Sequence, residues 1–205
     1  MGRETMKMKV GRILTLADGI FAIAMTLLAV TIDLPRKEHQ LSTEGLHKFL
    51  FGQFQEIFNY VLSFILLALF WIMHHRQFHY ITHTDKRHLW INILMFMSIT
   101  LVPFSTSMAG DFPADWITQA YFHLNMMIMG ILFYLNWSYA TKNKHLVEES
   151  ITESEINLEK KQLLVTPSVA FFALVVSFTQ PRISIYLYIL IPAILSLKGF
   201  NSKES

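Results

Sequence analysis

The chain has 205 residues, of which 53% are hydrophobic and only 16% are charged, and its formal net charge is +2 at pH 7. Soluble domains carry about a quarter charged residues, so this composition disfavours a soluble enzyme or a nucleic-acid-binding domain. Cysteine is absent, which excludes disulfides, thiolate catalysis and cysteine-based zinc sites.

Long apolar runs separated by polar segments predict an all-α, polytopic membrane protein, because a spanning helix needs about 20 mostly apolar residues. The first run follows a basic start and continues to Pro35, which is too long for the apolar region of a signal peptide, so we expect a retained helix. An amphipathic segment around Leu46 to Phe54 leads into the second helix. We expect one domain over 1–205 with six membrane helices at 10–32, 54–75, 88–108, 115–140, 162–179 and 182–198.

The connections between these helices have the composition of turns and solvated loops. Gly110 to Pro113 is typical of a turn, and Gln180-Pro181-Arg182 predicts a hairpin between the last two helices. The charged segment 141–161 predicts a solvated connection, helical in part.

Lys and Arg are unevenly divided between the two sets of loops. With six helices, 13 of the 17 fall at the termini and in the second and fourth connections, and four fall in the others. Cytoplasmic loops are enriched in Lys and Arg. We therefore expect a multi-pass protein of the cell membrane with both termini in the cytoplasm.

Asp18 lies inside an apolar helix, where an uncompensated carboxylate costs a few kcal/mol or more. Arg12 precedes it by six residues and therefore lies on a different helix face. We expect Asp18 to bond to another helix, with His74 or His75 as its partner. Two roles stay open, a packing anchor and direct contact with a permeating ion or proton.

Histidines cluster at the end of the second predicted helix. His75, His79 and His83 have the i, i+4, i+8 spacing of one helix face, which would also suit a metal. A membrane metalloenzyme using this cluster is therefore one interpretation. The sequence has no Ser-His-Asp pattern, no phosphate-binding glycine loop and no paired carboxylates on one predicted helix.

Ile23, Thr26, Leu27 and Val30 follow Asp18 with the spacing of one helical stripe. Ordinary packing between helices explains such a stripe. Repeated around a symmetry axis, it would instead form apolar rings with a threonine ring between them, and apolar rings can gate a pore by dewetting.

The segment Arg12-Ile-Leu-Thr-Leu-Ala-Asp18 and the apolar helix after it resemble the first-helix signature of the transmembrane protein 175 family of potassium channels. Further similarity lies in Phe70-Trp71-Ile-Met-His74-His75-Arg76, in Leu89-Trp90-Ile-Asn92 and in Pro103-Phe104-Ser105-Thr106. The signature of the family has Phe and Ser where this chain has Leu16 and Ala17.

The resemblance implies a potassium-permeable leak channel, not an enzyme, in which four six-helix subunits form a homotetramer in the lipid bilayer. The first helices would line the central pore, and potassium ions would pass without any bound cofactor or resident metal. Carried over by position, the constriction and selectivity residues would be Ile23, Thr26, Leu27 and Val30. Polar residues supporting the pore helix would be Arg12, Asp18, His74, His75 and Asn92.

A different class of protein also fits part of the pattern. A proton-coupled secondary transporter could use Asp18 and His74 as a relay. Transporters usually have helices interrupted by Gly or Pro near the membrane midplane, whereas the first helix here has Gly19 near its start and then continues to Pro35. This difference favours the channel.

Overall fold

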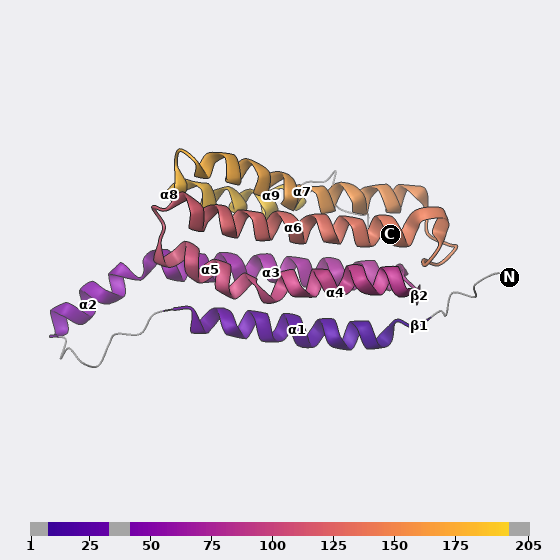
Figure 1. Cartoon of the computed structure of the whole chain (residues 1–205), viewed down its shortest axis with the longest axis horizontal. Coiled ribbons are helices and arrows are strands. Elements are labelled where there is room, and N and C mark those ends of the chain that lie inside the picture. The colour runs from indigo at the N-terminus through magenta and orange to yellow at the C-terminus, as the bar shows by residue number, and fades with distance from the viewer. Residues whose placement is uncertain (1–7, 33–41, 197–205) are drawn as a thin grey trace.

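The computed structural model describes residues 8–32 and 42–196, and for Met8 and Lys9 the backbone alone. The described chain is built from helices, which run side by side as an elongated bundle (Figure 1). The longer elements are α1 Gly11–Val30, α2 Thr43–Gly52, α3 Phe54–Tyr80, α4 Lys86–Thr100, α5 Val102–Asp111, α6 Trp116–Thr141 and α7 Glu153–Ser177. The shorter ones are β1 Met8–Lys9, β2 His83–Thr84, η1 Lys142–Lys144, α8 Pro181–Ser184, η2 Ile185–Ile189 and α9 Leu190–Leu195.

The helices form successive layers, with α1 at one edge of the bundle (Figure 1). α1 packs on α3, α4 and α5, and α6 packs on α4, α5 and α7. The apolar core between them holds fully buried side chains from every layer, including Phe21, Leu67, Phe133 and Tyr188. Because α1 has neighbours on one side alone among the described residues 8–32 and 42–196, its opposite side is uncovered by this part of the chain.

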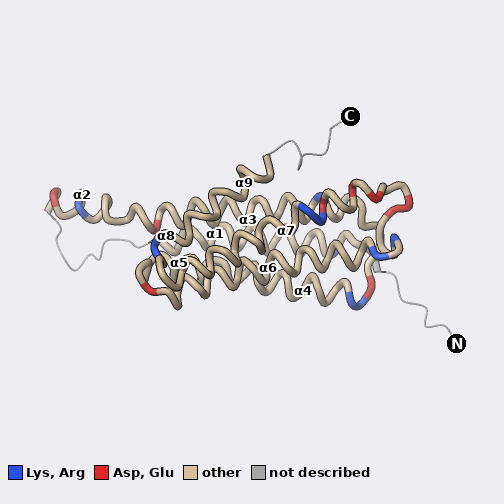
Figure 2. Tube along the Cα trace, turned by 90° about the horizontal axis from the view of Figure 1, so that it is seen from above, with Lys and Arg blue, Asp and Glu red and all other residues tan. Residues whose placement is uncertain are grey.

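Charged residues gather toward the two ends of the bundle and leave a long uncharged stretch between them (Figure 2). Among the described residues, four helices are long and apolar enough to cross a membrane: Gly11–Val30, Phe54–Tyr80, Lys86–Asp111 and Glu153–Ser177. α6 is not one of these four, although its 26 residues are enough to span a membrane. Polar side chains such as His123 and Asn136 lower its mean hydropathy. Pro181–Leu195 is apolar but shorter. The chain is therefore a membrane protein with several candidate spanning helices.

The helix from 88 to 108 that the sequence predicts is divided in the structure at Leu101, between α4 and α5. Pro103 has no backbone N–H and cannot donate to the carbonyl four residues before it. Just before this point, the N–H of Leu101 bonds to the carbonyl of Ser98 at 3.3 Å. This carbonyl is three residues back, so the turn is tighter than that of an α-helix. α5 then continues to Asp111, so Gly110 is helical and the turn begins at Phe112.

The other helix ends differ from expectation for equally local reasons. α3 continues to Tyr80, five residues past the predicted end. α7 begins at Glu153 inside the predicted connection, because Thr152 and Glu155 cap it reciprocally. α1 ends at Val30, and Pro35 lies outside the described residues. The last predicted helix is split into α8, η2 and α9 up to Leu195, and its end at 197–198 also lies outside them.

At one end of the bundle, three segments are joined by backbone hydrogen bonds. β1 pairs antiparallel with β2, which joins the residues before α1 to the α3–α4 connection. The N–H of Thr82 bonds to the carbonyl of Leu146 at 2.9 Å. The N–H of Glu148 bonds to the carbonyl of Tyr80 at 3.0 Å. The start of α1 is thereby tied to the segment between α6 and α7.

A candidate pore helix and its polar support

α1 has two unlike faces. One is buried against the neighbouring helices by Ile13, Ala17, Phe21, Ala24 and Leu28. The other is uncovered within the chain and carries all four predicted constriction residues. Ile23 is 60% exposed, Leu27 47% and Val30 78%, and Thr26 is exposed between them.

Small residues lie on the same uncovered face. Thr15, Gly19, Ala22, Thr26 and Ala29 recur at alternating spacings of four and three, and all are exposed. The hydroxyl of Thr26 donates to the carbonyls of Ala22 and Ile23, at 2.9 Å each. Its proton is therefore directed to the helix, and its oxygen lone pairs are left for a cation or water.

Asp18 joins α1 to α3. Its Oδ1 accepts a hydrogen bond from Trp71 Nε1 at 3.0 Å and contacts His75 Nε2 at 3.1 Å. The indole and imidazole are one helical turn apart on α3 and meet edge to face, with ring centroids 4.7 Å apart. Asp18 therefore bonds to another helix, as expected, through His75 and the unforeseen Trp71.

His74 lies on a different face of α3 and belongs to a second, buried cluster. Its Nε2 lies 3.4 Å from Asn92 Oδ1 of α4. The amide of Asn92 donates to Asn136 Oδ1 at 2.8 Å, and the amide of Asn136 donates to Gln77 Oε1 at 2.8 Å. These four residues connect α3, α4 and α6 away from water, where polar groups must satisfy one another.

The structure thus divides the five predicted supporting residues. Asp18 and His75 meet at the side of α1, His74 and Asn92 meet behind it, and Asp18 does not bond to His74. Arg12 is exposed at the start of α1 and makes no hydrogen bond to either cluster within the described chain.

Three further residues of these clusters were not predicted, although each left a signal in the sequence. Trp71 precedes His75 by four residues and so shares its helix face. Gln77 follows His74 by three and shares the other face. Asn136 is an amide within an apolar run, and in a membrane such a residue usually turns toward protein.

The predicted histidine face is interrupted. α3 ends at Tyr80, so His83 lies in β2, where its Nδ1 is 2.8 Å from Thr82 Oγ1. The helical spacing from His75 to His83 is therefore lost. Within the part of the chain that the structure describes, no group of three or more His, Cys, Asp or Glu side chains is arranged to hold a metal ion.

Comparison with known proteins relates this architecture to one family. A family model described as endosomal/lysosomal potassium channel TMEM175 matches residues 12–103. A potassium channel of Streptomyces collinus is 30% identical over 145 residues, covering 69% of each chain. A potassium channel of Chamaesiphon minutus is 28% identical over 179 residues, covering 85% of this chain and 87% of its own.

A solved structure supports the same relation. It is described as the crystal structure of a lysosomal potassium-selective channel TMEM175 homologue from Chamaesiphon minutus. It superposes with a TM-score of 0.80 at 26% identity and covers 94% of this chain and 98% of its own. The likeness extends beyond the matched residues 12–103 to α6 and the helices after it.

Proposed function

Because the chain belongs to the TMEM175 family of potassium channels, we propose that it forms a potassium-permeable channel with a pore lined by α1. The observation that carries this proposal is the uncovered face of α1, which presents Ile23, Thr26, Leu27 and Val30 together. Four chains around a common axis would bring these residues into successive rings.

The chemistry of these side chains suits a constriction without a carbonyl filter. Rings of Ile23, Leu27 and Val30 would dewet a narrow passage and so oppose ion entry. The Thr26 ring between them would offer hydroxyl oxygens to a partly dehydrated cation. One hydroxyl ring replaces a hydration shell less completely than stacked carbonyl rings, so we expect modest selectivity for potassium over sodium.

The polar clusters would hold this pore wall in place. The bonds from Trp71 and His75 to Asp18 fix the rotation of α1 relative to α3. The buried amides of Asn92 and Asn136 keep α3, α4 and α6 in register behind it.

We further propose six crossings per subunit with both termini in the cytoplasm. Lys86–Asp111 counts as one crossing, α6 is long enough for another, and the segment from Pro181 returns along the bundle as the last (Figure 1). The end of the bundle that holds β1, β2 and the start of α7 also holds most Lys and Arg of the described chain (Figure 2), as a cytoplasmic side should.

Purified protein in liposomes tests the proposal. Potassium efflux should exceed that of empty liposomes and should fall strongly in Thr26→Val, which removes the hydroxyl ring. It should also fall in Ile23→Trp, which fills the constriction. Ile128, with 48% exposure, lies on α6, so Ile128→Trp is a matched control that should leave the flux unchanged.

The interpretation depends on the state of the assembly. A well-folded tetramer that passes no potassium would refute the channel. An equal loss of potassium efflux in Ile23→Trp and in Ile128→Trp would refute α1 as the pore wall. Saturable flux that follows an imposed pH gradient would instead support the transporter.

A further inference from the structure

A cavity of about 340 Å³ opens at the start of α4, on the end of the bundle that carries most basic residues. It is lined by Lys86, Arg87, Trp90, Ile91 and Tyr139. The surface that lines it is almost wholly apolar, so Lys86 and Arg87 contribute their side-chain stems beside an indole and a phenol ring, and both basic residues are exposed. This concave site lies apart from the pore face of α1.

The two cations are not explained by the stability of the helix. Lys86 and Arg87 occupy the first turn of α4, where the helix dipole disfavours positive charge. The nearest acid in sequence, Asp85, has other partners: it accepts from the backbone N–H of His88 at 2.9 Å and from the hydroxyl of Tyr139 at 2.7 Å, and it contacts His145 Nε2 at 3.2 Å. Among the described residues, neither Lys86 nor Arg87 forms an ion pair.

An exposed apolar stripe continues from the cations along the helix surface. Trp90, Leu94, Met97, Leu101 and Phe104 recur at spacings of four and three, and each is exposed. At 1.5 Å per residue the stripe is roughly 21 Å long, more than the ~15 Å hydrocarbon thickness of one leaflet. Trp90 is 63% exposed, as suits a residue with an indole at the level of the headgroups.

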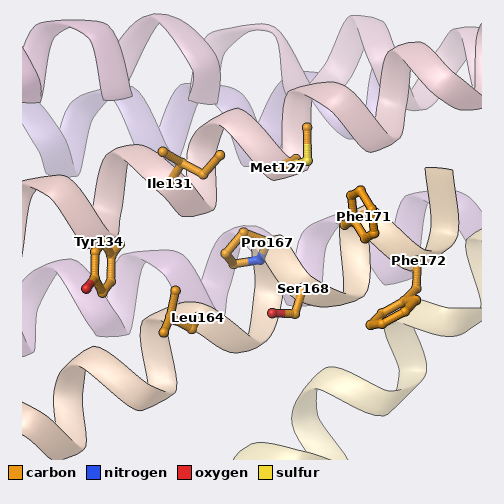
Figure 3. Close-up of a pocket in the computed structure, with 8 residues that line it drawn as sticks. All are labelled: Met127, Ile131, Tyr134, Leu164, Pro167, Ser168, Phe171 and Phe172. Atoms are coloured by element: carbon orange, nitrogen blue, oxygen red, sulfur yellow. The ribbon is translucent and has the colours of Figure 1, made fainter. Parts of the chain in front are cut away.

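A second cavity, of about 390 Å³ between α6 and α7, provides a contrast (Figure 3). Apolar side chains such as Ile131, Leu164 and Phe171 surround it, and Tyr134 and Ser168 supply its polar groups. Among the described residues, no charged side chain lines it. It could accept an acyl chain from any lipid, whereas the apolar site on α4 has two exposed basic residues, Lys86 and Arg87, that could distinguish headgroups by charge.

We propose that the α4 site binds an anionic glycerophospholipid of the cytoplasmic leaflet. Lys86 and Arg87 hold the headgroup phosphate, Trp90 and Tyr139 pack against the glycerol region, and one acyl chain follows the stripe to Phe104. The choice of leaflet rests on the proposed orientation of the channel, but the binding chemistry does not.

The test measures lipid binding and not ion flux, so its failure is distinguishable from failure of the channel proposal. Delipidated full-length protein in detergent is titrated with phosphatidylglycerol or phosphatidylcholine, and bound lipid is counted by native mass spectrometry. Each basic group near anionic lipid contributes about 1 kcal/mol. Lys86→Gln combined with Arg87→Gln should therefore weaken phosphatidylglycerol binding by roughly 10- to 30-fold and leave phosphatidylcholine binding unchanged.

Two further variants keep the test specific. Lys160→Gln combined with Lys161→Gln removes the same charge from α7 and should have no such effect. Lys86→Arg combined with Arg87→Lys keeps both charges and should bind as the wild type does, which separates lost charge from misfolding.

Any of four results would overturn the proposal. One is equal affinity of the wild-type protein for the two lipids. Another is equal weakening by the α7 variant, which would mean that overall charge decides. The third is full displacement of phosphatidylglycerol by inorganic phosphate, which would mean a phosphate site with no use for the stripe. The fourth is a change of oligomeric state in Leu94→Asp with lipid binding unchanged, since the stripe would then be a subunit interface.

Discussion

Asp18 carries a carboxylate on a membrane helix, and its two partners on α3 offset the cost of keeping it there. Trp71 donates to it at 3.0 Å, and His75 lies at 3.1 Å from the same oxygen. The side chain remains 51% exposed, so water shares in its solvation and the bonds contribute less than fully buried ones would. The contact therefore sets the rotation of α1 more than it adds to stability.

Replacing Asp18 separates its hydrogen bonds from its charge. Asp18→Ala removes the acceptor for Trp71 and should cost about 1 kcal/mol, whereas Asp18→Asn keeps an acceptor oxygen and should retain most of that stability. The stability of both variants is measured by thermal unfolding in detergent, monitored by near-ultraviolet circular dichroism. Equal losses in the two variants would mean that the charge and not the bond is what matters.

Asp85 joins the start of α4 to the α6–α7 connection. Burial raises the pKa of Asp85, but the N–H of His88, the hydroxyl of Tyr139 and the ring of His145 outweigh it, and the pKa lies below its ordinary 3.8. A lowered carboxyl pKa adds stability above the ordinary value, and this stability is lost as the pH falls through the lowered one.

Asp85→Ala tests this contribution. At neutral pH the free energy of unfolding of the variant should be about 1 kcal/mol lower, because removing the carboxylate also removes the cap of α4. The difference from the wild-type protein should be constant from pH 7 to about pH 5 and should shrink below pH 3.8. Asp85→Asn is the control that keeps a cap without the charge. A difference in stability that widens on acidification would mean that folding raises the pKa of this carboxyl.

At the scale of helices, α6 and α7 meet so closely that one position accepts glycine alone. A Cβ added at Gly130 would lie 2.6 Å from Cδ and 3.1 Å from N of Pro167. Neither atom belongs to a flexible chain end, so the helices themselves would have to separate.

Gly130→Ala should therefore destabilise the protein by about 1–3 kcal/mol, as overpacking does. Gly52→Ala is the control, because nothing lies within 4 Å of a Cβ built there. Combining Gly130→Ala with Pro167→Ala removes the shortest contact, the one to Cδ, and keeps the one to the backbone N. The double variant should therefore recover part of the lost stability, measured again by thermal unfolding. Full stability of Gly130→Ala alone would contradict this packing.

Helices were predictable from the sequence where apolar length alone defines them, and less so where single residues decide their ends. α1, α3 and α6 lie close to their predicted ranges. The break before Pro103 and the early start of α7 depend on one missing N–H and one reciprocal cap. The Thr152-x-x-Glu155 spacing was readable as a cap, but the charge of the segment around it favoured a loop.

The candidate site also has one part that the sequence predicts and one part that it does not. Which residues share one face of α1 follows from periodicity, whereas the structure shows that the face with Ile23, Thr26, Leu27 and Val30 is the exposed one. Which histidine reaches Asp18 depends on the rotation of α3 relative to α1. This rotation is set by packing between elements far apart in sequence, so the choice between His74 and His75 had to come from the structure.

At the scale of the whole molecule, the uncovered face of α1 predicts assembly. A single chain leaves it unpacked, whereas a tetramer would enclose it around a shared axis. Mass photometry of the detergent-solubilised protein should give four times the chain mass of 23.8 kDa after correction for detergent. A stable monomer would remove the shared pore, and a dimer would require another arrangement of α1.

The β1–β2 pair has a mechanical consequence for such a pore. It joins one end of α1 to the α3–α4 connection. This end is therefore a fixed pivot, about which α1 could tilt as a rigid helix. α1 has 20 residues and is about 30 Å long, so a tilt of only ~5° would carry its far end roughly 2.6 Å. Val30 would then travel farther than Thr15 on each opening.

The absence of cysteine allows this to be measured with single introduced labels. Distances between spin labels on neighbouring subunits should be broadly distributed at Ala29 and narrow at Thr15. Equal widths at the two positions would mean that α1 shifts as a whole and has no fixed pivot.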